Sequence, residues 1–146
     1  MYDIKVYVAC ALTHAPESFK LEVEKFKEKL SKICHMLYFK GISDKNSPRE
    51  VYLHDIRACV EEAGLVVAIC DHASIGLGYE IAVQAEKKQG AVLAVASKDA
   101  LVTKLILDPP LKDFSFRRYE NLIEDVYAMV LKKLKQMTLL SSVIEG

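Results

Sequence analysis

The stretch Leu65-Val-Val-Ala-Ile-Cys70 lies near the middle of a chain of 146 residues and is apolar throughout. A strand with one face in water alternates apolar and polar residues, so an unbroken apolar run predicts a strand that is covered on both faces. Residues 91–96 have the same character. Each run has six residues, whereas a membrane-spanning helix needs about twenty, so we expect neither run to cross a bilayer.

Segments with a helical period of apolar residues lie on either side of these two runs. Between residues 19 and 33 an apolar side chain recurs every three or four positions, and lysine and glutamate occupy the positions between, which is typical of a helix with one buried face. Similar patterns predict further helices over residues 49–63, 79–89, 101–107 and 119–134. Strands are predicted over residues 4–10, 34–39 and 114–116, besides the two central ones.

This alternation of strands and helices predicts a three-layer α/β domain of the flavodoxin or Rossmann-like kind. We expect a parallel sheet of about five strands in the order 2-1-3-4-5, with helices on both faces. The length favours one domain, which we place at residues 1–136. Residues 137–146 are expected to form a frayed tail or an apolar flap that docks on a neighbouring molecule, and residues 43–48 a mobile loop.

Composition narrows the class of partner. Lys plus Arg number 20, as do Asp plus Glu, so charge gives no support for binding to a nucleic acid polymer or to an anionic membrane. The first residues lack the pattern of a secretion signal, and the four cysteines are widely spaced within apolar stretches, so we expect reduced thiols and a cytoplasmic protein. The histidines lack the spacing of metal ligands, and we expect neither a metal nor a cofactor.

The segment after the central strand carries the residues of greatest chemical interest. Parallel sheets bind ligands at the carboxyl edge where the strand order reverses, here between the first and third strands. Gly76 and Gly78 permit close approach of an anion or phosphate to the backbone. Glu80 is expected in the first turn of the next helix, where the helix dipole favours an ionised carboxylate that can act as a nucleophile or accept hydrogen bonds from a sugar. The simpler alternative is that the glutamate only satisfies free N–H groups and the glycines only form a turn.

Asp55 and Tyr7 support the chemical interpretation. Asp55 is expected near the start of the second helix, and with the strand order 2-1-3 Tyr7 lies between the loops that would present Asp55 and Glu80. Two carboxylates on either side of a crevice, with a phenol nearby, form the arrangement that cleavage of a glycosidic bond requires. One carboxylate attacks or stabilises the sugar carbon, and the other transfers protons.

Residues 55–82, DIRACVEEAGLVVAICDHASIGLGYEIA, resemble the nucleoside 2-deoxyribosyltransferase superfamily, in particular its branch of 2'-deoxynucleoside 5'-phosphate N-hydrolases. The most specific part is Ser74-Ile-Gly-Leu-Gly-Tyr-Glu80. The resemblance implies that Glu80 is the nucleophile that forms a glycosyl-enzyme intermediate, that Asp55 assists catalysis, and that Tyr7 orients both groups around the sugar.

The same resemblance implies a binding site for the 5' side of a nucleotide. The loop Ser74-Ile-Gly-Leu-Gly78 matches the one that holds this side, and Thr103 matches a position that reaches the phosphate in a neighbouring subunit, which implies a homodimer or a higher homo-oligomer. Relatives that hydrolyse phosphorylated substrates carry an arginine after the first strand, and here that stretch is Cys10-Ala-Leu-Thr-His14. Thr13 and His14 are therefore the expected polar groups at this end, although neither replaces a bidentate guanidinium.

Three functions remain open at this point. The first is an N-glycoside hydrolase or a deoxyribosyltransferase, which differ only in whether water or a second base resolves the intermediate. The second is a nucleotide-binding or regulatory module without turnover, and the third is a glycohydrolase acting on NAD. The glycine spacing does not match the Gly-x-Gly-x-x-Gly dinucleotide motif, which disfavours hydride transfer.

Overall fold

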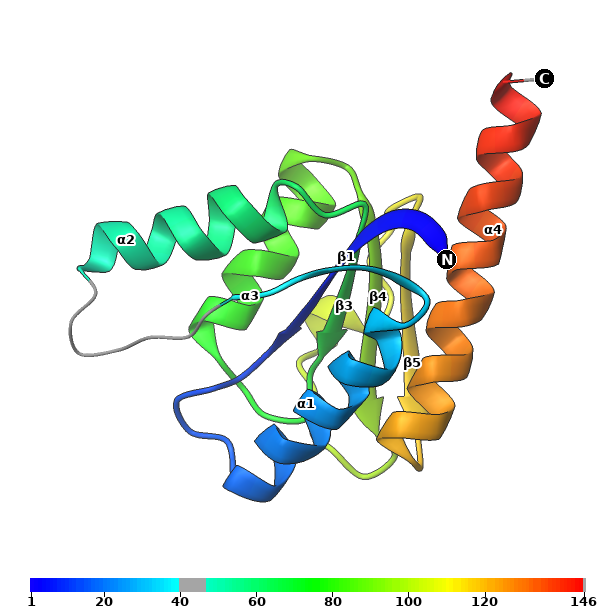
Figure 1. Cartoon of the computed structure of the whole chain (residues 1–146). Helices are drawn as coiled ribbons and strands as arrows, with labels where there is room; N and C mark the ends of the chain where they lie inside the picture. Colours follow the sequence, from blue (N-terminus) through cyan, green and yellow to red (C-terminus); the bar gives the residue numbers. More distant parts are fainter. Residues whose placement is uncertain (40–46, 146) are drawn as a thin grey trace.

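The computed structural model describes residues 1–39 and 47–145, and its core is a parallel five-stranded sheet in the order β2-β1-β3-β4-β5 (Figure 1). The strands are β1 (Tyr2–Cys10), β2 (Cys34–Leu37), β3 (Leu65–Ile69), β4 (Ala91–Ser97) and β5 (Phe114–Tyr119). The predicted parallel sheet and its strand order are thereby confirmed.

Helices cover both faces of the sheet, as predicted (Figure 1). One face is covered by α1 (Glu17–Ser31), by the π-type turn η4 (Leu122–Val126) and by α4 (Tyr127–Glu145). The other face is covered by two helices that each continue into a π-type segment. These are α2 (Pro48–Tyr52) with η1 (Leu53–Val60), and α3 (Ile75–Ala82) with η2 (Val83–Lys87).

The two faces of the sheet differ in side-chain size. Beneath α1 and α4 the central strands present valine, leucine and isoleucine. Beneath α3 a row of alanines crosses three strands, because Ala9 on β1 pairs in register with Ala68 on β3, which pairs with Ala94 on β4. All three are almost fully buried. Small side chains in this row leave room for α3 near the carboxyl edge of the sheet.

The strand β2 is short, which leaves part of β1 without a neighbour on that side. Leu37, the last residue of β2, pairs with Tyr7. Residues 8–10 of β1 pair with β3 on the other side, and among the described residues no strand pairs with them on the β2 side. The predicted strand 34–39 therefore ends two residues early, and no described strand covers the edge beside Val8 and Cys10.

Three predicted helices have different bounds. α3 begins at Ile75 rather than residue 79, because Ser74 caps it. Residues 101–107 form only the 3₁₀ turn η3 (Lys104–Ile106), since the two prolines at 109 and 110 prevent its extension. The last helix starts later than residue 119, because Tyr119 belongs to β5.

The C-terminal residues are helical rather than a frayed tail. α4 continues without a break through residue 136, where we expected the domain to end, and its last turns extend beyond the sheet (Figure 1). Four apolar side chains on these turns are exposed: Leu139, Leu140, Val143 and Ile144. The expected mobile loop falls mainly on residues 43–46, outside the described residues. No helix in the described part of the chain has both the length and the apolar character needed to span a membrane.

The alanine row generates a prediction about stability. Ala68→Leu adds three carbon atoms where β3 meets α3, and we expect it to lower the free energy of unfolding by about 1–3 kcal/mol through overpacking. Urea denaturation measures this change. Ala58→Leu is the matched control, because Ala58 is exposed on η1 and the same substitution there should change stability by only about 0.5 kcal/mol. Equal effects of the two substitutions would show that the space beneath α3 is not restricted.

Candidate active site

The candidate site lies at the carboxyl edge of the sheet, where β1 and β3 are neighbours. After β3 the chain turns into α3, whose first turn is fixed by a hydrogen bond from the backbone N–H of Leu77 to the hydroxyl oxygen of Ser74 at 3.2 Å. The apolar side chains of Leu77 and Ile81 then pack on the sheet, and Glu80, which lies between them in sequence, is buried with them.

The structure brings the three predicted catalytic residues together. The hydroxyl of Tyr7 on β1 donates a hydrogen bond to Oδ1 of Asp55 on η1, at 2.9 Å. Glu80 on α3 lies beside both and is 5% exposed, and its Oε2 has no hydrogen-bond partner among the described residues. Buried polar atoms are rarely left in this state, so the unpartnered oxygen marks Glu80 as a candidate functional group.

The expectation that Glu80 is ionised is wrong, because its pKa is raised. The pKa of Glu80 is raised from 4.5 to about 9, mainly by burial and then by the nearby Asp55 carboxyl, while Tyr7 and Lys27 lower it. Glu80 also lies in the second turn of α3 rather than the first, since the helix begins at Ile75. A helix dipole contributes about 0.3–1 kcal/mol, which would lower the pKa by less than one unit. The effect of burial on the pKa of Glu80 is therefore larger than the effect of the dipole. Glu80 therefore carries a proton near neutral pH.

Tyr7 acts as a hydrogen-bond donor in this group. Burial raises the pKa of its hydroxyl far above the ordinary value, and the carboxyls of Glu80 and Asp55 raise it further. The phenol therefore stays protonated and holds one oxygen of Asp55. Asp55 lies in the middle of the continuous helix formed by α2 and η1, not near its start as predicted.

The predicted binding residues line two hollows that share Ser74. Thr13, His14 and Gly76 border the first, whose volume is about 370 Å³. Gly78 and Thr103 border the second. A Cβ atom added at Gly78 would meet no atom within 4 Å, so packing does not require glycine there, and the backbone is accessible from this side.

The sequence did not predict a pair of hydrogen bonds that connects the strands at this edge of the sheet. The Tyr119 hydroxyl donates a hydrogen bond to Oδ2 of Asp71 at 2.6 Å, and the backbone N–H of Ser97 donates to Oδ1 at 3.2 Å. Asp71 thus connects the ends of β3, β4 and β5 beside the hollow that Thr103 borders. The sequence offered one weak signal, an aspartate directly after a fully buried strand.

Two further residues near the site were not singled out for it. Tyr52 on α2 meets the ring of Tyr79 edge to face at 6.3 Å, and both border a hollow next to Asp55. Lys27 on α1 borders another hollow together with Tyr7 and Phe39. In the sequence Lys27 is one of several lysines on an amphipathic helix, and nothing in the pattern separates it from the others.

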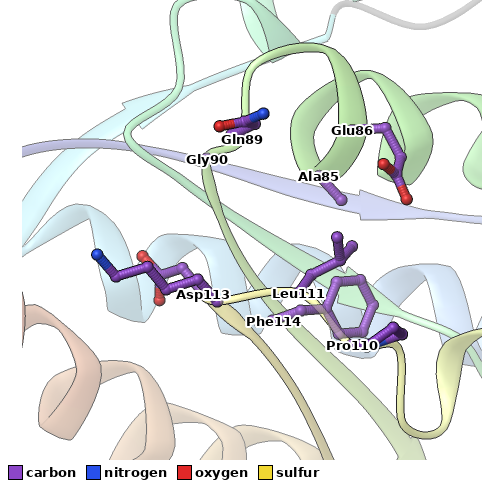
Figure 2. Close-up of a pocket in the computed structure, with 9 residues that line it drawn as sticks. Ala85, Glu86, Gln89, Gly90, Pro110, Leu111, Asp113 and Phe114 are labelled. Atoms are coloured by element: carbon purple, nitrogen blue, oxygen red, sulfur yellow. The ribbon is translucent and has the colours of Figure 1, made fainter.

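A different hollow lies at the opposite edge of the sheet (Figure 2). It is bordered by Gln89 and Gly90, just before β4, and by Asp113 and Phe114, where β5 begins. None of the predicted site residues borders it, so we place the candidate chemistry at the carboxyl edge.

Within residues 1–39 and 47–145, no three His, Cys, Asp or Glu side chains form a group that could hold a metal ion. No protein-family model matches the chain, and no curated protein matches it in sequence. The case for a function therefore depends on the geometry of the site.

The buried carboxyl predicts a pH dependence of stability. The pKa of Glu80 is about 9 in the folded protein against 4.5 when exposed, so its stabilising contribution is fully present below pH 4.5 and is lost as the pH rises through 9. Between pH 5 and 9 we expect the wild type to lose on the order of 3–6 kcal/mol of stability that Glu80→Gln retains. Urea unfolding at several pH values measures the difference.

Glu86→Gln is the control for this titration, since Glu86 is an exposed glutamate on η2, directly after α3. It should keep the pH dependence of the wild type. If Glu80→Gln also kept it, the buried carboxyl would not be the group that titrates.

Proposed function

We propose that this protein cleaves the N-glycosidic bond of a nucleoside or of its 5'-monophosphate, through a covalent intermediate on Glu80. The observation that carries the proposal is the pair of carboxyls, Glu80 and Asp55, with Tyr7 bonded to one of them, at the point where strand order reverses. Two neighbouring carboxyls can supply the nucleophile and the proton donor that this reaction needs.

The protonated state of Glu80 suits the first step. The pair holds one proton before the reaction, and Glu80 must lose it before its oxygen can attack. We assign the transfer to Asp55, which takes the proton and passes it to the base as the bond between C1' and the base nitrogen breaks. The electron pair of that bond leaves with the base, and an oxygen of Glu80 forms the new bond to C1'.

The second step regenerates the carboxyl pair. Asp55, now ionised, accepts a proton from water, and the resulting hydroxide attacks C1' and displaces Glu80. In a transferase a second base takes the place of water. Tyr7 remains protonated throughout and keeps Asp55 oriented towards the reacting atoms.

The hollow bordered by Thr13, His14 and Ser74 suits the 5' end of the substrate. Its polar groups are a hydroxyl from each of Thr13 and Ser74 and the imidazole of His14, with accessible backbone at Gly76. These groups can bind a phosphate or a free 5'-hydroxyl.

A homodimer is part of the proposal. Three apolar side chains near the hollows of Ser74 and Thr103 are exposed, Ile75 at 95%, Leu101 at 99% and Leu105 at 82%. Exposed apolar side chains that gather at a site favour a covering partner, and a second copy of this chain is the partner that the sequence resemblance implies.

The test is release of free base from a panel of nucleosides and their 5'-monophosphates, followed by chromatography. Glu80→Gln is expected to reduce release by about 10³-fold or more, since it removes the nucleophile while keeping the shape of the side chain. Glu86→Gln, on the exposed side of the next segment, should be as active as the wild type.

Other outcomes assign other functions. Base exchange that requires an added second base would make the protein a transferase. Nicotinamide release from NAD would make it an NAD glycohydrolase. Thermal stabilisation by a nucleotide without any base release would contradict catalysis and identify a nucleotide-binding module.

A further inference from the structure

Lys27 is a lysine whose side chain turns away from solvent. It belongs to α1, yet its side chain is only 13% exposed, whereas its ion-pair partner Glu24 is 65% exposed, with 3.2 Å between Nζ and Oε1. The neighbouring Lys25 on the same helix is exposed. A long cationic side chain loses conformational freedom and hydration when it is buried, so this position calls for an explanation.

The hollow that Lys27 borders lies beside the part of β1 that no described strand covers. Its lining includes Val8 and Cys10, the part of β1 that no described strand covers beyond Leu37. Tyr7 also lines it, and the Tyr7 hydroxyl bonds to Asp55. The hollow therefore lies next to Tyr7, the residue that bonds to Asp55.

The Lys27 ammonium affects the pKa values of groups in and near the candidate site. Burial raises the pKa values of Glu80, Cys10 and Cys59, and the Lys27 ammonium lowers all three. Cys59 and Glu80 lie on the helices of the opposite face of the sheet from α1, so the effect of the ammonium extends to both faces. Among the described residues Glu24 is its hydrogen-bond acceptor, which leaves N–H groups for a ligand.

The shape and lining of the hollow suit one part of a substrate. Its volume is about 200 Å³, smaller than the roughly 300–1,000 Å³ of pockets that enclose a whole drug-sized ligand. Leu12 and Phe39 give it apolar walls, and the ion pair of Lys27 and Glu24 gives it a cation beside an anion. A flat heterocycle fits between these walls, with the Lys27 ammonium as its hydrogen-bond donor.

We propose that Lys27 is the catalytic residue that stabilises the leaving base, by donating a hydrogen bond from its ammonium to a ring nitrogen or carbonyl oxygen of a base seated in the hollow of Tyr7 and Phe39. This inference rests on the proposed function. As the bond to C1' breaks, its electron pair passes to the base, and the ammonium offsets the developing charge while Asp55 delivers the proton. Lys27 itself keeps its protons.

The dependence of the rate on the leaving base tests this role. Lys27→Met should slow release of thymine from thymidine about 10- to 100-fold, the effect of losing a charged hydrogen bond. Release of 5-fluorouracil, a better leaving group, should slow much less. Halogenated and unsubstituted purine nucleosides form the equivalent pair if the wild type accepts only purines. Lys27→Arg should restore part of the rate, because it keeps a cationic donor.

Lys25→Met is the matched control, and it should behave as the wild type. Equal slowing of good and poor leaving bases by Lys27→Met would overturn the role, because loss of structure or of ionised Glu80 affects both alike. A Lys27→Met variant as active as the control would also overturn the proposed role of Lys27. If Tyr52→Ala then raised KM, that result would place the base between Tyr52 and Tyr79. If the wild type released no base, the proposed function itself would be wrong. In the two outcomes above the wild type still releases base, so only the role of Lys27 would be wrong.

Discussion

The hydrogen bond from Tyr7 to Asp55 joins two segments that are 48 residues apart in the chain, and the site depends on it. It forms because β1 lies inside the sheet, between β2 and β3, so that a residue of the first strand faces helices that follow later strands. With β1 at an edge of the sheet, Tyr7 would not lie between η1 and α3. The strand order is therefore a condition for the chemistry as well as a feature of the fold.

Burial of Glu80 is the second constraint, and the shape of the sheet makes it possible. The alanines at positions 9, 68 and 94 provide the space into which α3 packs. Transfer of a carboxylate out of water is unfavourable enough that the group keeps its proton instead, which agrees with a pKa of about 9. In the proposed reaction, the proton that burial holds on the pair is also the proton that the departing base needs. Burial of Glu80 would then supply the acid as well as hold the nucleophile in its protonated form.

Sequence patterns predicted those parts of the structure that depend on local order. Unbroken apolar runs indicated β3 and β4, and the alternation of elements indicated a parallel sheet with its order. Tyr7, Asp55 and Glu80 were identified because residue type and strand order together limit what can meet at one edge. The start of α3 was placed four residues late, since Gly76 and Gly78 disfavour a helix locally while the cap at Ser74 and tertiary packing overcome that preference. The protonation of Glu80 and the position of Lys27 depend on which segments lie nearby, and no pattern along one segment contains that information.

Buried polar side chains at the two edges of the sheet differ in their hydrogen-bond partners. Near the amino edge the ammonium of Lys88 donates hydrogen bonds to the carbonyl oxygens of Val60 and Ala63 and to Oε1 of Gln84, at 2.8–2.9 Å, and the amide nitrogen of Gln84 donates in turn to a carbonyl at the start of β4. At the carboxyl edge Oε2 of Glu80 has no such partner in the described part of the chain. An unsatisfied buried polar atom costs about 1–3 kcal/mol. The buried glutamine therefore has protein partners at one end, whereas the unpartnered oxygen of the buried glutamate at the other end agrees with the proposed function, in which Glu80 contacts a substrate.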